Sequence, residues 1–113
     1  MADKRDIRRI KQRITIYFGL VDVSRVAFTE DISTSGMFIK TPNITPVNSI
    51  IKIQFTLTDG SVVGVEGRVT WARKVPQNLF HLVKKSGMGV RFLRFLSGEE
   101  AFNSFFKKVA TTR

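Results

Sequence analysis

Apolar and polar residues alternate with a period of two through the middle of the chain, and this pattern constrains the fold more than any other. Every odd-numbered residue of 51–57 is apolar and every even-numbered one is polar. Such alternation is typical of a strand with one face in a core and the other in solvent. It returns over 63–71, which places Trp71 in the core. The intervening Asp59-Gly60 predicts a two-residue hairpin turn.

Shorter stretches with strand character precede and follow this hairpin. They are 14–20, where Ile14, Ile16, Phe18 and Leu20 share one face, then 26–31, 37–40 and 88–93. The basic stretch 72–87 predicts a loop with a brief strand near 79–83. Gly67 occupies an inward position inside a strand, which indicates a bend or a close backbone approach. This is expected where a sheet curls into a barrel.

The end of the chain changes to a helical period. Residues 97–100, Ser-Gly-Glu-Glu, match a capping box in which Ser97 caps the helix. An apolar stripe follows at helical spacing, formed by Phe102, Phe105, Phe106 and Val109. We therefore expect a helix over 97–110, packed on a barrel over 14–96.

Length and composition limit the remaining choices. A chain of 113 residues is long enough for one domain with one core. It has no cysteine, which excludes disulfides and thiolate metal sites. No apolar run reaches the roughly 18 to 20 residues of a membrane-spanning helix, and no secretory signal precedes the first strand. These features predict a cytoplasmic location.

The charge balance predicts an anionic partner. Nineteen Lys and Arg face nine Asp and Glu, a formal net charge of +10. Nucleic acid, a phosphorylated small molecule and an acidic protein or lipid surface all satisfy that sign. The alternative is a solvated basic surface that binds no specific partner.

Two polar segments stand apart from the strand pattern. Residues 1–13 form a basic stretch with little apolar material, which predicts a flexible arm. Residues 31–36, Asp-Ile-Ser-Thr-Ser-Gly, predict a tight polar strand end, since Asp and Ser hydrogen-bond locally and Gly relaxes the backbone. The arginines of the arm supply planar, bidentate donors.

These segments resemble the signature of PilZ domains. Arg9 and Arg13 match an Arg-x-x-x-Arg motif before the first strand, and Asp31, Ser33 and Gly36 match Asp/Asn-x-Ser-x-x-Gly. The resemblance covers essentially the whole chain. It implies an all-β fold, a six-stranded antiparallel β-barrel with a C-terminal α-helix. It also implies a bacterial receptor for the second messenger cyclic di-GMP, which relays its signal to a downstream protein.

The chemistry of the motif suits that ligand. An arginine can clamp a phosphodiester, bond the O6 and N7 edge of guanine or stack on its face. Asp31 can accept hydrogen bonds from the guanine N1 and N2 donors, Ser33 can donate to a phosphate or base, and Gly36 lets the chain turn closely.

Further residues extend the predicted site. In the family, an arginine at the position of Arg8 goes with binding of an intercalated ligand dimer. Lys11, Gly89 and Arg91 are candidates for its edge, although Arg91 fits equally well on the outside of its strand. The arm is expected to close over the ligand and give a partner protein a new surface.

Two other readings stay open, a basic barrel that binds nucleic acid and a PilZ-like protein adaptor that binds no ligand. Nucleic acid is the weaker of the partners, because the aromatic residues mostly follow the apolar alternation instead of forming a platform. An enzyme is not expected. His81 is the only histidine, so neither a metal cluster nor a histidine triad can be assembled. The sequence leaves monomer and homodimer open.

Overall fold

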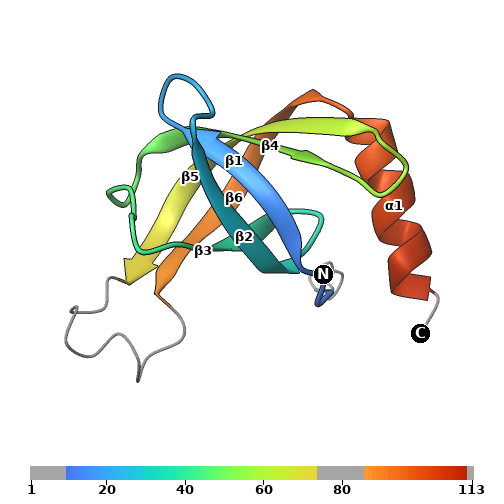
Figure 1. Cartoon of the computed structure of the whole chain (residues 1–113), viewed down its shortest axis with the longest axis horizontal. Coiled ribbons are helices and arrows are strands. Elements are labelled where there is room, and N and C mark those ends of the chain that lie inside the picture. The colour runs from blue at the N-terminus through green and yellow to red at the C-terminus, as the bar shows by residue number, and fades with distance from the viewer. Residues whose placement is uncertain (1–9, 74–85, 112–113) are drawn as a thin grey trace, which may run out of the picture.

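Six antiparallel strands close into a barrel in the order β1-β2-β3-β6-β5-β4, and a helix follows the last strand (Figure 1). The computed structural model describes residues 10–73 and 86–111. The elements are β1 (Ile14–Gly19), β2 (Arg25–Ile32), β3 (Gly36–Lys40), β4 (Ile50–Thr56), β5 (Val62–Arg73), β6 (Gly87–Ser97) and α1 (Glu99–Thr111). The predicted six-stranded barrel with a C-terminal helix is confirmed. Arg8, Arg9 and the brief strand predicted near 79–83 lie outside the described residues.

The alternation that predicted β4 and β5 corresponds to the inner and outer faces of the barrel. Ile51, Ile53 and Phe55 are at most 1% exposed, and Val63 and Val65 are fully buried. Burial of each such side chain contributes about 1.5 to 3 kcal/mol. The barrel core is therefore built from the apolar positions that the period of two identifies.

The hairpin between β4 and β5 has a three-residue loop, so the predicted two-residue turn is wrong. The Leu57 N–H donates to the Ser61 carbonyl at 2.8 Å, and the Gly60 N–H donates back to the Leu57 carbonyl at 2.9 Å. Gly60 has φ 92°. This is a turn closed by a residue in the left-handed region, the usual solution for a loop of this length.

Trp71 is 46% exposed, so its predicted place in the core is wrong. The ladder between β5 and β6 shifts its register between Val69 and Trp71, which pair with the consecutive residues Val90 and Gly89. A bulge inserts one extra residue and reverses the faces beyond it. Val69 therefore points inward and Trp71 outward, although two positions apart they would share a face in a regular strand.

The apolar face of β1 ends at Phe18, two residues earlier than predicted. The strand stops at Gly19, where the backbone turns so tightly that an added Cβ would lie 1.8 Å from the Asp22 carbonyl oxygen. Leu20 follows this turn and is 60% exposed. It belongs to the connection between β1 and β2 and not to the core.

The start of α1 also differs from the prediction. Ser97 is the last residue of β6, and Gly98 is the N-cap, with its carbonyl accepting the Phe102 N–H at 2.9 Å. The predicted capping role of Ser97 is therefore wrong, because β6 is longer than its apolar pattern suggested.

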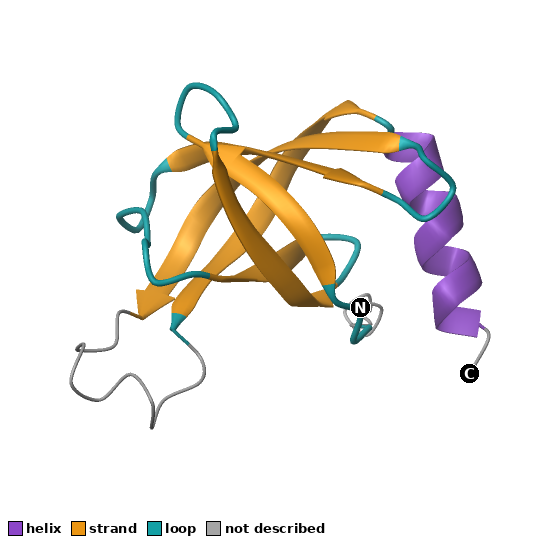
Figure 2. Ribbon diagram, in the orientation of Figure 1, coloured by secondary structure: helices purple, strands orange, loops and turns teal. Residues whose placement is uncertain are grey.

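The helix docks on one end of the barrel through aromatic contacts, beside the β4–β5 hairpin (Figure 2). Phe102 is fully buried, and its ring centroid lies 6.0 Å from that of Phe55, 6.1 Å from that of Phe92 and 5.5 Å from that of Phe95. Edge and tilted ring pairs at these separations add to the gain from burial. In the part of the chain that the structure describes, no helix is long and apolar enough to cross a membrane.

Candidate ligand-binding site

The two motif segments are joined by a short antiparallel bridge. The Ile10 N–H donates to the Ile32 carbonyl at 2.9 Å, and the Ile32 N–H donates to the Ile10 carbonyl at 3.2 Å. Both side chains are buried in the core. The bridge therefore fixes the end of the arginine segment beside the polar end of β2, where Asp31 and Ser33 flank Ile32.

Asp31 faces outward because β2 contains a bulge. Thr29 pairs with Ile39 and is fully buried, whereas Asp31 pairs with Phe38, and the register shifts between them. Without that shift Asp31 would share the inward face of Thr29. The Thr29 hydroxyl donates to the Asp31 carbonyl at 3.3 Å and lies 3.4 Å from the Asp31 nitrogen. The bulge presents the carboxylate, half-buried, on the outer surface.

Ser33 is buried inside the turn that follows β2. Its N–H donates to the Gly36 carbonyl at 2.8 Å, and its hydroxyl donates to the same carbonyl at 3.3 Å. The hydroxyl also accepts the Ser35 N–H at 3.2 Å. Its exposed fraction is 0%. In this structure the Ser33 side chain serves the geometry of the turn, and Thr34 is the exposed residue at its tip.

Gly36 begins β3 where this strand approaches β6. An added Cβ would lie 2.3 Å from the Val90 carbonyl oxygen and 3.4 Å from the Arg91 Cα. The Phe92 N–H donates to the Ser35 carbonyl at 2.8 Å and ties the turn to the same strand. Gly36 is thus required by the space between two backbones, and the turn is bonded directly to β6.

Arg13 lies on the outer surface, just before β1. Its guanidinium carbon is 4.0 Å from the centroid of the Phe28 ring. Phe28 pairs with Thr15 in the β1–β2 ladder, so strand pairing places this half-buried residue beside the start of β1. The cation–π contact leaves the exposed arginine on the same barrel wall as Asp31. Lys11 is also exposed near this edge.

A second bulge places Trp71 in line with the motif, which the sequence did not indicate. Register pairs run across the outer wall from Asp31 to Phe38, Gly89 and Trp71. The Phe38 and Trp71 rings stack, with centroids 5.5 Å apart and an interplanar angle of 20°. The indole covers Gly89, where an added Cβ would lie 2.1 Å from the Trp71 Nε1. Gly89 supports this aromatic surface, and Arg91 is exposed beside it.

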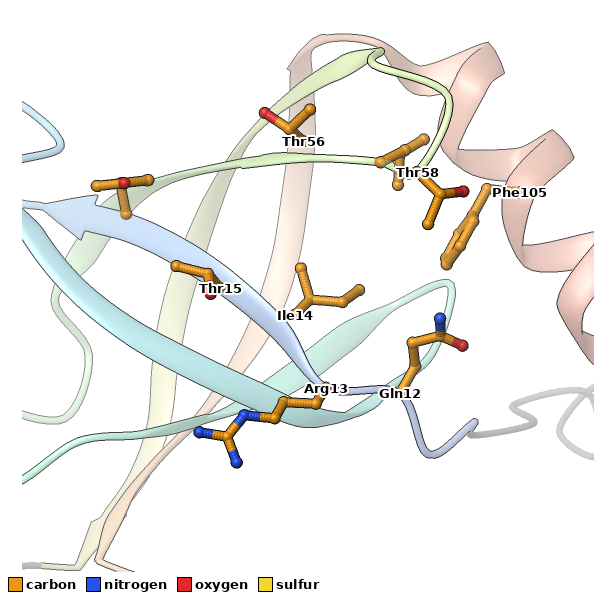
Figure 3. Close-up of a pocket in the computed structure, with 9 residues that line it drawn as sticks. Gln12, Arg13, Ile14, Thr15, Thr56, Thr58 and Phe105 are labelled. Carbon is orange, nitrogen blue, oxygen red and sulfur yellow. The ribbon is translucent and has the colours of Figure 1, made fainter.

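A groove of about 410 Å³ lies on the other side of Arg13 (Figure 3). It is bounded by the start of β1, the loop after β4 and Phe105 of α1, and its lining is mostly threonine and apolar. Arg13 lines this groove, but Asp31, Ser33 and Gly36 do not. The candidate site is therefore the outer wall around the β2–β3 turn and not this groove. Among the residues that the structure describes, no group of three or more His, Asp or Glu is placed to hold a metal ion.

Comparisons with known proteins assign the chain to a family. The model of the PilZ domain matches residues 3–103. Among solved structures, the Bacillus subtilis inhibitor of motility, MotI/DgrA, has a similar fold, with a TM-score of 0.73 at 12% sequence identity. The alignment covers 99% of this chain and 55% of that one, so the chain spans about half the length of the Bacillus protein. No curated protein matches the sequence. Because the PilZ model covers most of the sequence, the chain belongs to the PilZ domain family.

Proposed function

We propose that this chain is a receptor for cyclic di-GMP that binds the dinucleotide on its outer barrel wall. The observation that supports the proposal is the bridge between Ile10 and Ile32, which holds a residue from within the Arg-x-x-x-Arg motif beside Asp31 and Ser33. PilZ domains are binding domains of cyclic di-GMP signalling. Arg13 and Asp31 on the same barrel wall suit a ligand that combines anionic phosphodiesters with guanine donors.

Each residue of the motif has a distinct role in this proposal. Arg9 and Arg13 bind phosphate or the guanine edge, and Asp31 accepts from guanine N1 and N2. Ser33 and Gly36 hold the turn that follows β2, and the bulge in β2 directs the Asp31 carboxylate outward. The support for these last two roles is the buried Ser33 hydroxyl and the close approach of Gly36 to β6.

We propose that Arg8 determines how many ligand molecules bind to the chain. An additional guanidinium before the motif provides one more plane on which a guanine can stack. Arg8 then supports an intercalated pair of ligand molecules. The bound ligand changes the outer wall of the barrel, and a downstream protein recognises that change.

Calorimetric titration at physiological salt tests the proposal. Cyclic di-GMP, GTP and a short oligonucleotide are titrated in parallel. Saturable binding of cyclic di-GMP alone is expected, with two ligands per chain if Arg8 supports the dimer. Tighter binding of the oligonucleotide with a steep salt dependence would contradict the proposal and favour a nucleic-acid barrel.

Arginine variants assign the site. Arg9→Ala and Arg13→Ala should each weaken binding by about tenfold to a hundredfold, since one charge-assisted bidentate contact contributes about 1.5 to 3 kcal/mol. Arg25→Ala is the matched control, an exposed arginine at the start of β2, near the connection from β1. Equal losses in all three variants would indicate a general charge effect and not a site.

A further inference from the structure

Two arginines lie side by side on the barrel wall next to the β2–β3 turn. Gly36 pairs with Arg91 across β3 and β6, and Arg91 pairs with Arg68 across β6 and β5. Both arginines are exposed. Neighbouring strands are about 5 Å apart, so the backbone of Arg91 lies about 5 Å, and that of Arg68 about 10 Å, from the backbone of Gly36.

This arrangement is unfavourable for the isolated barrel. Like charges directly opposite each other in a ladder destabilise a sheet. Within residues 10–73 and 86–111, neither guanidinium forms an ion pair with a described carboxylate. The same two strands contain the opposite case, because Arg94 faces Glu66 and its Nε lies 2.9 Å from the Oε1 atom. The ladder pairs one arginine with an acid and leaves two arginines facing each other.

The surroundings of the pair suit a nucleotide. Arg91 follows Gly89 on the same outward face of β6, and the indole of Trp71 covers Gly89. The exposed ring of Trp71 therefore borders the arginines. Two forked cations beside an aromatic face supply contacts to phosphate oxygens and to an adjoining base.

We propose that Arg68 and Arg91 form an anion subsite that binds a phosphodiester of cyclic di-GMP and extends the site from the β2–β3 turn across β6 to β5. The inference rests on the proposed function, since it names further contacts for the same ligand. Two facing guanidinium groups neutralise one phosphodiester from both sides, and the ligand removes the repulsion that the free barrel carries.

Titration of the variants Arg68→Gln, Arg91→Gln and the double variant with cyclic di-GMP tests the subsite. We expect each single change to weaken binding about fivefold and the double change about thirtyfold, which is the range for exposed charge-assisted contacts. The salt dependence of the affinity should become shallower in each variant, because fewer charge contacts remain for salt to screen. Arg25→Gln, which removes the same charge far from the turn, should bind like the unmodified chain.

Thermal unfolding without ligand provides the second readout. Because each single change removes a like-charge contact, the midpoint should rise or stay constant while affinity falls, which a folding defect would not produce. Unaltered affinity in the double variant overturns the subsite while leaving the receptor proposal intact. A loss equal to that of Arg25→Gln also overturns it. If the unmodified chain does not bind cyclic di-GMP, the receptor proposal fails and the subsite fails with it.

Discussion

The turn between β2 and β3 and the turn between β4 and β5 use similar residues for different reasons. Both contain a glycine near their end. A 2.8 Å bond joins the Ser33 N–H to the Gly36 carbonyl in the first turn, and another of 2.8 Å joins the Leu57 N–H to the Ser61 carbonyl around the second. At Gly60 the backbone has φ 92° and an added Cβ would meet nothing within 4 Å. At Gly36 the backbone is not left-handed, and the added Cβ would lie 2.3 Å from the Val90 carbonyl oxygen. Gly60 is required because its backbone is left-handed, and Gly36 is required because there is no room for a Cβ.

The two turns differ in how they are bonded to the rest of the barrel. Residues 58–60 of the β4–β5 turn are exposed, and its backbone hydrogen bonds lie within the turn, so it closes a hairpin beside α1. The β2–β3 turn has a buried serine, a bond to Phe92 of β6 and, beside it, the bridge from Ile10 to Ile32. A turn tied to its neighbours on both sides holds its side chains in fixed positions, as a binding surface requires.

Among the turn variants, Gly36→Ala should cause the largest loss of stability. The new Cβ meets backbone atoms of β6, which cannot move without disturbing the ladder, so we expect a loss of about 3 kcal/mol in the free energy of unfolding. Chemical denaturation measures the loss. A cost below that of Gly60→Ala would reverse the distinction between the two turns.

Ser33→Ala should have the next largest effect. The change removes the hydroxyl that bonds the Gly36 carbonyl at 3.3 Å and accepts the Ser35 N–H at 3.2 Å. Because the site is buried, we expect a loss of about 1 to 2 kcal/mol in unfolding free energy. Thr34→Ala, at the exposed tip of the same turn, is the control and should be nearly neutral. Equal effects would mean that the Ser33 hydroxyl does not hold the turn.

The sequence predicted the barrel well because the period of two reports burial directly. Ile51, Ile53 and Phe55 show this, since each apolar position of their strand lies in the core. The motif residues were likewise recognisable as a polar strand end. Their roles as ligand contacts stay a prediction, and Arg8 and Arg9 lie outside the described residues.

The bulges account for what the sequence did not predict. A bulge reverses the faces of a strand, and nothing in the local pattern of Val69 to Trp71 marks the extra residue. The outward turn of Trp71 depends on pairing with β6, where Gly89 leaves room for the indole. The facing of Arg68 and Arg91 is likewise a consequence of register, because the two lie in strands that are distant in sequence.

Gly60→Ala should cost about 1 kcal/mol, the usual penalty for a left-handed backbone with a Cβ. The space around the position is open, so no packing term is added. Affinity for cyclic di-GMP should be unchanged, because the β4–β5 turn takes no part in the proposed site. A larger stability loss, or weaker ligand binding, would show that this turn is coupled to the rest of the barrel.

Asp59→Asn should give the smallest effect, one that depends on pH. The Asp59 Oδ1 accepts the Ser61 N–H at 2.9 Å, and this bond is the main cause that lowers the pKa of the carboxyl below its usual value. A lowered pKa in the folded state adds stability above the unfolded pKa of about 3.9, and that stability is lost as pH falls through the folded pKa. Asparagine keeps an acceptor but not the charge.

The thermal midpoint of Asp59→Asn should therefore lie slightly below that of the unmodified chain at neutral pH, and the two should converge in acid. Asp22→Asn, in the exposed β1–β2 connection, controls for the change in net charge. A pH-independent difference would assign the effect to turn geometry and not to charge. The exposed turn would then depend on backbone conformation alone, which sharpens its contrast with the buried turn at Ser33.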